Sequence, residues 1–540
     1  GNGATGFVLG ARTQFGVDVG ESRGTITLSG DSSVGISGSG DSTIYHWGII
    51  ESNANNTIGI QLADPLTPPA PSERPEVYNR GEMNFFGESA KGVSTGAYSN
   101  SYNGLLAIMN FEGPGSTAVE SGDIGSSYNR GTITMSADNS EGNESIAVKS
   151  GEGTDLSANF AYAENGANGV ITMSGDHSVG MEVGDFGQIF NDGQLVVTGD
   201  FSFGIRAGLE SYTFNSRRIE ISGTDSIGVD LEGRNLEGQE AGFENALGGS
   251  LVSKDPNAGP LIRLGAGLSE NHVKNNGYKS DEPDVHSLIS ANVEAVDPTL
   301  NRGVAIQGSD GVDRITNGAD IQGLVLLGGD DDIYESYITG QIADLGSGTL
   351  DGGTGEDTLD LTVDPDRPSS ETGLFNLGVV KDFEAIRVSQ GRWLVSGRPT
   401  PADSGSTNLV VASGGTLRIE TPLSIPGDYS HEAPTEPSDP LARVEVVLTK
   451  ENKGSGEALL QVEGTANLSN GELEIELGPG LQESGEFILV ESGEDLTTEF
   501  DSIIEPEIVR RYESELINAR GIHTSMSTLL DGLKLQSLEE

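Results

Sequence analysis

The chain has 540 residues, of which 83 are Asp or Glu and 30 are Lys or Arg, so its net charge is −53. A surface this acidic repels phosphate backbones and anionic lipid headgroups, which argues against nucleic-acid binding. Glycine contributes 78 residues and cysteine none, and no run of about 18 apolar residues occurs, which excludes a disulfide scaffold, thiol chemistry and a membrane-spanning helix.

One phrase recurs along the chain and decides the predicted fold. It runs from Gly24 to Ile36 and returns from Gly169 to Met181 and from Gly193 to Ile205. Each copy alternates apolar and polar residues, then has a Gly-Asp turn and a second short run, which is typical of strands joined by tight turns. The last two copies start 24 residues apart. A period in the twenties with almost no helical pattern predicts coils of a parallel β-helix.

Two other repeat architectures fit the sequence less well. Propeller blades repeat at about 40 to 50 residues, and no such period is kept. A string of sandwich domains has no reason to reuse one phrase.

A second phrase, Tyr78 to Gly81, returns at Tyr128 to Gly131. The longer intervals between copies predict loop inserts at Leu62–Val77, Ser94–Asp123 and Gln239–Asp297, where binding surfaces are expected.

The composition changes from Gly303 to about Asp366, where Gly and Asp dominate. Gly352 to Asp360 matches the nine-residue consensus of calcium-binding β-rolls, although it stands apart from any adjoining full match. Calcium prefers hard oxygen ligands from successive turns. The alternative, which we favour, is solvated turns in which Asp caps tight glycine bends. The candidate calcium ligands are Asp330, Asp331, Asp332, Asp351 and Asp357.

The C-terminal part has two kinds of sequence pattern, one typical of strands and one typical of helices. Phe375 to Ile504 reads as strands throughout. Beyond Pro506, apolar residues recur with a helical period at Ile508, Tyr512, Leu516 and Ala519, and a second, weaker amphipathic stretch extends to Leu533. We therefore predict a short helical linker at the C-terminal end.

The C-terminal third carries a family resemblance. The segments Gly378–Trp393, Gly414–Leu417, Gly464–Leu473 and Phe487–Gly493 occur in the order found in the pertactin-like C-terminal passenger region of type V autotransporters, which this chain resembles. The resemblance implies a right-handed β-helix with an autochaperone end and a helix leading to an outer-membrane barrel in the precursor. The chain ends at Glu540 without that barrel, so it is expected to be the exported passenger or a fragment of it, and the absence of cysteine suits export.

No catalytic constellation emerges from the sequence. None of the six histidines lies in a subtilisin-type setting. Gly30-Asp-Ser32 and Gly40-Asp-Ser42 match the three letters of an esterase nucleophile, but the repeat places His177 and Phe201 where the first has serine. A nucleophile would not vary among copies, so these are expected to be structural turns. A polysaccharide lyase would bind an anionic polymer, which the net charge repels.

The sequence thus predicts an all-β protein, a right-handed parallel β-helix with a short C-terminal helical linker. Its expected segments are irregular coils at 1–302, Gly/Asp-rich coils at 303–370, an autochaperone-like region at 371–504 and the linker at 505–540. The expected function is that of a secreted or surface-displayed, non-enzymatic adhesin or structural protein, without a required cofactor. Its expected location is extracellular or on the outer-membrane surface of a Gram-negative bacterium. Its partner would be a receptor or neighbouring cell surface. The alternatives are a self-assembling filament subunit and, less favoured, the passenger of a protease or esterase whose catalytic segment lies elsewhere.

Overall fold

The structure is a computed structural model. It describes residues 5–9, 14–16, 24–39, 42–65, 67–70, 73–155, 159–233, 242–265, 270–277, 287–300, 302–366, 370–402, 405–451, 456–478, 487–494, 496, 499–504 and 533–537. The chain divides into two compact units. Unit 1 comprises residues 1–312 and 320–324, and unit 2 comprises residues 313–319 and 325–540.

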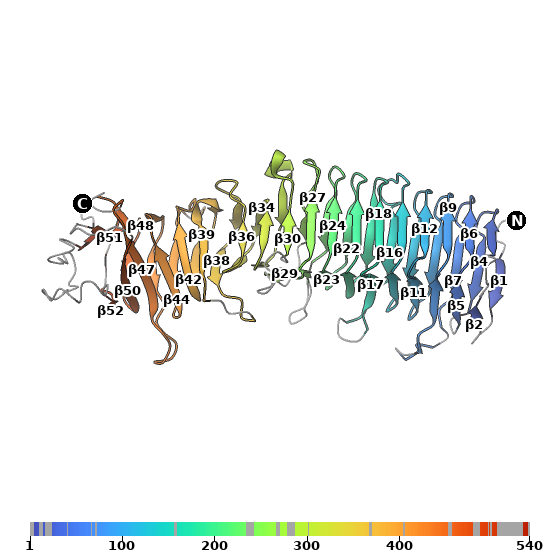
Figure 1. Ribbon diagram of the computed structural model, residues 1–540, viewed down its shortest axis with the longest axis horizontal. Coiled ribbons are helices and arrows are strands. Elements are labelled where there is room, and N and C mark those ends of the chain that lie inside the picture. The colour runs from blue at the N-terminus through green and yellow to red at the C-terminus, as the bar shows by residue number, and fades with distance from the viewer. Residues whose placement is uncertain are drawn as a thin grey trace. The chain divides into compact units, whose positions relative to one another are not determined.

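Unit 1 is a parallel β-helix, in which each coil adds one strand to each of three sheets (Figure 1). Sheet A contains β1 (Thr5–Leu9), β4 (Val34–Gly38), β7 (Ile58–Leu62), β10 (Lys91–Thr95), β13 (Thr117–Ser121), β16 (Ser145–Ser150), β19 (Ser178–Val183), β22 (Phe203–Ala207), β25 (Ile227–Leu231), β28 (Ile262–Leu264) and β31 (Val304–Gln307). Sheet B contains β2 (Gln14–Gly16), β5 (Thr43–His46), β8 (Glu76–Asn79), β11 (Asn100–Asn103), β14 (Ser126–Asn129), β17 (Ala161–Asn165), β20 (Gly187–Asn191), β23 (Tyr212–Asn215), β26 (Gly242–Asn245) and β29 (Asn271–Asn275).

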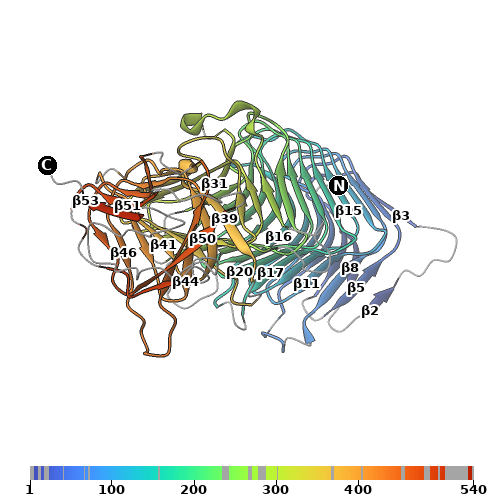
Figure 2. The ribbon, with the colours of Figure 1, turned by 60° about the vertical axis from the view of Figure 1, so that its left-hand side comes forward.

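Sheet C completes the coils and lies on a different side from sheet B, as β3 and β15 against β5, β8 and β11 show in Figure 2. Sheet C contains β3 (Thr25–Leu28), β6 (Ile49–Ser52), β9 (Glu82–Phe85), β12 (Ile108–Phe111), β15 (Thr132–Met135), β18 (Val170–Met173), β21 (Gln194–Val197), β24 (Arg218–Ile221), β27 (Ser250–Ser253), β30 (Leu288–Ser290) and β33 (Asp320–Gln322). The unit also has two 3-10 turns, η2 (Val293–Ala295) and η3 (Pro298–Leu300).

Unit 2 is built from parallel strands as well. One sheet contains β32 (Asp313–Asn317), β35 (Ile333–Tyr337), β38 (Thr358–Thr362), β41 (Ala385–Val388), β43 (Asn408–Val411), β46 (Tyr429–His431) and β49 (Ala466–Asn467). The others contain β34 (Leu324–Gly329), β37 (Leu350–Thr354) and β40 (Val380–Lys381); β39 (Thr372–Asn376), β42 (Gly391–Ser396), β44 (Gly415–Ile419), β47 (Ala442–Leu448), β50 (Gly471–Leu477) and β52 (Ser502–Ile504); and β45 (Leu423–Ile425), β48 (Ala458–Val462), β51 (Phe487–Ser492) and β53 (Leu533–Ser537). Two short elements remain, β36 (Gln341–Ile342) and η4 (Leu377–Val379).

The recurring phrase forms the strand–turn–strand step from sheet C to sheet A. Its apolar positions point inward, and Ile171, Met173, Leu195 and Val197 are fully buried, which confirms the predicted alternation. Each buried aliphatic side chain stabilises the fold by about 1.5 to 3 kcal/mol relative to an exposed one. Equivalent residues stack coil on coil, so the repeats build one continuous apolar core. The predicted β-helix is therefore confirmed.

The aspartate of the Gly-Asp turn has a structural role. The Oδ1 atom of Asp176 accepts a hydrogen bond from the N–H of Asp200 at 2.8 Å, and Asp200 does the same for Thr224 at 2.7 Å. In the Gly30-Asp-Ser32 copy, Asp31 accepts from the N–H of Asn55 in the next coil at 3.1 Å. Each turn thus holds the backbone of the following coil, which fits the structural interpretation of these motifs.

A ladder of buried asparagines runs through sheet B of unit 1. In each rung the side-chain Nδ2 donates to the Oδ1 of the next asparagine at 2.8–3.0 Å. His46 continues the ladder, with its Nδ1 atom 2.9 Å from the Oδ1 of Asn79. These side chains satisfy one another where water cannot reach, so the ladder fixes the register between coils. The asparagine ladder consists of Asn79, Asn103, Asn129, Asn165, Asn191, Asn215, Asn245 and Asn275.

On the outer face of sheet B, tyrosines stack in register. The ring centroids of Tyr45 and Tyr78 lie 5.0 Å apart, those of Tyr78 and Tyr102 4.3 Å, and those of Tyr102 and Tyr128 4.4 Å. The rings are parallel within 6° and half-buried. Because each ring rests on two neighbours, the stack forms a rigid aromatic strip along four coils.

Three sequence predictions need correction or fall outside the structure. Ser94–Asp123 contains β11, β12 and β13, and Gln239–Asp297 contains β26 to β30, so both segments are coils of divergent sequence rather than long inserts. Of the helical linker predicted over 505–540, residues 505–532 and 538–540 lie outside the described residues. Leu533–Ser537, expected at the end of a helical stretch, forms β53 and pairs in parallel with β51. Among the described residues, no helix is long and apolar enough to cross a membrane.

Candidate functional site

The outer face of sheet A in unit 1 carries a row of charges that alternate in sign. The row occupies one register position on six consecutive strands from β13 to β28. Opposite charges side by side stabilise adjacent strands, whereas like charges directly opposite destabilise them. This charge ladder consists of Glu120, Lys149, Glu182, Arg206, Asp230 and Arg263.

The contacts within the charge ladder are close. The Lys149 Nζ lies 2.7 Å from a Glu182 oxygen, and the Arg206 Nε donates to the other oxygen at 2.9 Å. Arg263 forms a two-pronged pair with Asp230, at 2.7 Å and 2.8 Å. Burial alone would raise the pKa of Glu182, but Arg206 and Lys149 outweigh it and hold the pKa below its ordinary value. Every cation of the ladder from β16 to β28 is thus already neutralised.

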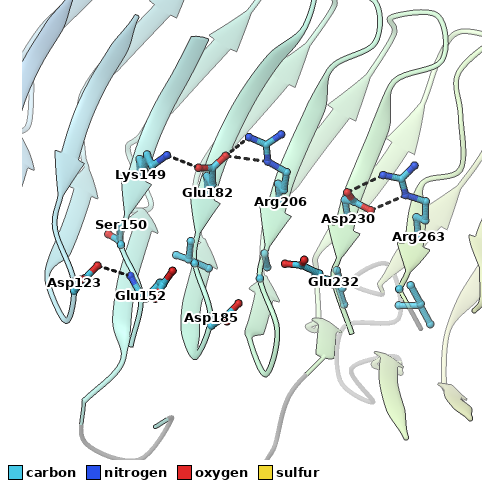
Figure 3. A pocket seen from close by; sticks show the side chains of 18 residues that line it. Asp123, Lys149, Ser150, Glu152, Glu182, Asp185, Arg206, Asp230, Glu232 and Arg263 are labelled. Atoms are coloured by element: carbon cyan, nitrogen blue, oxygen red, sulfur yellow. Dashed lines mark hydrogen bonds and ion pairs between the residues drawn. The ribbon is translucent and has the colours of Figure 1, made fainter. Parts of the chain in front are cut away.

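A groove of about 760 Å³ runs along this ladder (Figure 3). Its second wall consists of acids near the turns that follow the sheet A strands, namely Asp123, Glu152, Asp185 and Glu232. The lining comes from β16, β19, β22, β25 and β28, from the turns that follow these strands, and from Asp123, which follows β13. Neighbouring strands lie about 4.8 Å apart, so the groove spans on the order of 24 Å across six coils.

Two of the turn acids accept hydrogen bonds from backbone N–H groups of the next coil. The Oδ1 atom of Asp123 accepts from the N–H of Glu152 at 3.0 Å, and Asp185 accepts from the N–H of Leu209 at 2.9 Å. The side chains of Glu152 and Glu232 are exposed. The whole lining contains six carboxylates and three cations. The groove therefore favours a neutral or positively charged ligand.

The groove lining contains no histidine, and its one hydroxyl is engaged. The Ser150 Oγ donates to the carbonyl of Tyr162 at 2.6 Å and lies 2.9 Å from the Ser121 Oγ. The arrangement offers hydrogen-bond acceptors and donors along an extended path, which suits the binding of a polar chain.

The predicted calcium ligands fall into three places in unit 2. Asp330 and Asp331 are exposed at a turn, where Asp331 accepts from the N–H of Glu356 at 2.9 Å. Asp351 lies 2.9 Å from the Lys381 Nζ. Asp332 and Asp357 are fully buried and occupy neighbouring register positions.

The two buried aspartates form part of an acid column. The N–H of Asp313 donates to Asp332 at 2.7 Å, that of Asp332 to Asp357 at 2.9 Å, and that of Asp357 to Glu384 at 2.8 Å. Burial raises the pKa of Asp332 to about 8 and that of Asp357 to about 6. Their Oδ2 atoms have no hydrogen-bond partner.

Within the part of the chain that the structure describes, no three or more carboxylate or imidazole groups converge as a metal ion would require. The buried aspartates instead cap backbone amides of the adjacent coil, as the alternative interpretation expects, although Asp332 and Asp357 are buried rather than solvated. Calcium binding stays a hypothesis.

Sequence reasoning missed the charge ladder. Its members lie 24 to 33 residues apart, too far for a local motif. A signal exists, because Glu182 and Arg206 each directly follow the last residue of a copy of the recurring phrase, and Asp230 follows Gly228-Val229 in the same way. Aligning the copies would have placed all three charges in one column.

Comparisons of the chain with models of protein families, with curated proteins and with solved structures found no match.

Proposed function

We propose that the chain is the exported passenger region of a type V autotransporter and acts as a non-enzymatic adhesin on the cell surface. The groove along the charge ladder is the observation that carries the adhesive part of this proposal. A site that crosses six coils suits an extended polymer better than a compact metabolite. The passenger assignment rests on the C-terminal sequence resemblance, and the parallel β-helix agrees with it.

The charges of the groove select the ligand. An anionic polymer would face the turn acids and would have to displace carboxylates from Lys149, Arg206 and Arg263. Neutral or amine-bearing polysaccharides meet no such barrier, because hydroxyl and ammonium groups donate to carboxylates. We therefore assign the groove to a neutral or amine-bearing polysaccharide on another surface.

Binding of immobilised polysaccharides to the purified chain tests this function. Neutral and amine-bearing glycans should bind, and polygalacturonate should not. The variant Glu232→Trp places a bulky ring in the groove and should abolish binding, whereas Glu88→Trp, at an exposed turn outside the groove lining, should not. Equal binding by both variants would exclude the groove as the site. Turnover of any bound glycan would overturn the non-enzymatic assignment.

Self-association is a second candidate that one observation favours. A charge ladder of six alternating members is complementary to itself when two copies meet antiparallel. Glu120 would then face Arg263, Lys149 would face Asp230, and Glu182 would face Arg206 of the other copy. Such an isologous contact would give a dimer, on which filaments could build. Sedimentation of a strictly monomeric species at high protein concentration would rule this candidate out.

A further inference from the structure

A second exposed feature lies at the corner between sheets B and C. It differs from the groove in its chemistry. The residues that directly follow β5, β8, β11 and β14 stack on one another there. The N–H of Arg80 donates to the carbonyl of His46, that of Gly104 to Asn79, and that of Arg130 to Asn103, all at 2.7–2.8 Å. The corner patch consists of Trp47, Arg80, Leu105, Leu106 and Arg130.

The two leucines at its centre are not explained by packing. After Gly104 the turn carries two extra residues compared with the Arg130-Gly131 turn of the next coil. Leu105 is 58% exposed and Leu106 87% exposed. Leu106 also has φ of +69°, a left-handed conformation that favours Gly and Asn. The same conformation occurs at other turns, for example at Ile124 and Phe186. The exposure of the two leucines, rather than their backbone, therefore points to a binding role.

The flanking arginines pack against aromatic rings and have few carboxylate contacts, so they can bind an anion. The Arg80 guanidinium lies 5.5–5.8 Å from the ring centroids of Tyr45, Trp47 and Tyr78. Among the described residues, no carboxylate lies within ion-pair distance of it. Arg130 lies over the Tyr128 ring at 5.9 Å, and its ion pair with Glu164 is long, at 3.8 Å. The arginines sit one coil on each side of the leucines, about 10 Å apart.

We propose that the corner patch docks onto an anionic lipid surface. The arginines would bind headgroup phosphates, the leucine pair would enter the acyl boundary, and Trp47 would lie at the interface, where tryptophan and tyrosine concentrate. The leucines project from a turn rather than line a cavity, so they fit a fluid surface better than a partner protein that needs shape complementarity. This inference is independent of the groove.

The charge of the whole chain opposes this docking, as the sequence indicated, but it does not decide it. At physiological ionic strength the Debye length is about 8 Å, so acids beyond the neighbouring coils are largely screened. The cations next to the surface are then Arg80 and Arg130, of which Arg130 also has the carboxylate of Glu164 at 3.8 Å. Each arginine near an anionic leaflet should raise the affinity about fivefold.

Vesicle flotation with the full chain tests the proposal. The chain should bind phosphatidylglycerol-containing vesicles at physiological ionic strength and bind pure phosphatidylcholine weakly. The double variant Leu105→Ser/Leu106→Ser should lose about tenfold or more of the affinity. Arg80→Gln/Arg130→Gln should lose about 25-fold and with it the preference for anionic lipid. The matched control is Phe86→Ser, because Phe86 is also exposed, at 47%, but lies at the opposite end of its strand.

Trp47 gives a direct readout, because the only other tryptophan, Trp393, is fully buried. Brominated lipids should quench Trp47 and leave Trp393 unchanged. Failure of the chain to bind anionic vesicles, or equal binding by the leucine variant and Phe86→Ser, would overturn the proposal. Inhibition of vesicle binding by a low concentration of inorganic phosphate or of an acidic peptide would also overturn the proposal. Such inhibition would show that the partner is a soluble anion or a protein. Glu232→Trp should bind vesicles normally, so a failure of the lipid proposal can be distinguished from a failure of the groove proposal.

Discussion

Removing one rung of the asparagine ladder should destabilise unit 1 far more than removing a similar asparagine outside it. Asn165 lies in the middle of the ladder. Its Oδ1 accepts from Asn129 at 2.8 Å, and its Nδ2 donates to Asn191 at 2.8 Å. Asn165→Ala therefore leaves one buried donor and one buried acceptor unsatisfied. Each such group costs about 1 to 3 kcal/mol, so the local free energy of unfolding should fall by about 2 to 6 kcal/mol.

The matched control is Asn110→Ala. Asn110 donates to Asn84 at 2.8 Å, but the pair lies on the outer face of sheet C, where water replaces the lost partner. Its cost should stay below about 1 kcal/mol. Amide hydrogen exchange suits the measurement, because it reports the opening of individual strands in a repeat protein that need not unfold in one step.

A double variant sharpens the argument. Asn129→Ala leaves three groups unsatisfied, because the Asn129 Oδ1 also accepts from the N–H of Gly131 at 3.2 Å, and Asn165→Ala leaves two. Together they leave three, namely the donors of Asn103 and Gly131 and the acceptor of Asn191. The double variant should therefore cost about as much as Asn129→Ala alone, with a coupling of about 2 to 6 kcal/mol. Additive costs, or an Asn165→Ala effect equal to that of Asn110→Ala, would show that the ladder does not stabilise the coils through its hydrogen bonds.

Three further predictions test other parts of the molecule. Gly199→Ala should destabilise unit 1 by about 1 to 3 kcal/mol in thermal melts, because its Cβ would lie 2.0 Å from the Gly175 carbonyl, whereas Gly24→Ala, with open space around it, should be neutral. Burial lowers the pKa of His431 to about 4, so the neutral form is favoured in the fold and stability should fall by about 3 kcal/mol as the pH drops from 6.5 through 4; His431→Gln should flatten this loss in pH-dependent melts. If calcium binds in the acid column of unit 2, a chelator should lower the melting temperature, and an unchanged melting temperature would end that hypothesis.

The sequence was sufficient for the fold wherever a coil keeps its apolar alternation. The strands in the copies at Gly169 and Gly193 could be predicted, because Ile171 and Leu195 point inward at the expected positions. The prediction from sequence failed at β11, whose residues Asn-Ser-Tyr-Asn show no apolar alternation. There the inward positions are Ser101 and Asn103, which are buried through hydrogen bonds, while Tyr102 faces outward. A hydrophobic pattern cannot reveal a strand whose inner face is polar.

The candidate site escaped prediction for a different reason. Its charges become neighbours only when coils stack, so Glu182 and Arg206 meet across one full turn of the chain. The acid-rich segment, in contrast, attracted attention through local composition. Its side chains largely cap neighbouring backbone amides, as Asp332 and Asp357 do. Local composition thus pointed to unit 2, whereas the groove depends on register in unit 1.

The turn at Leu105 and Leu106 shows how this architecture accepts new sequence. Two extra residues enter the corner, yet the asparagines on either side keep their bonds at 3.0 Å and 2.9 Å, because the ladder holds the strands in place. A corner that tolerates insertion without disturbing the interior is a natural grafting position. Foreign peptides of greater length, such as epitopes or receptor ligands, could be displayed there at regular spacing along a scaffold that needs no redesign of its core.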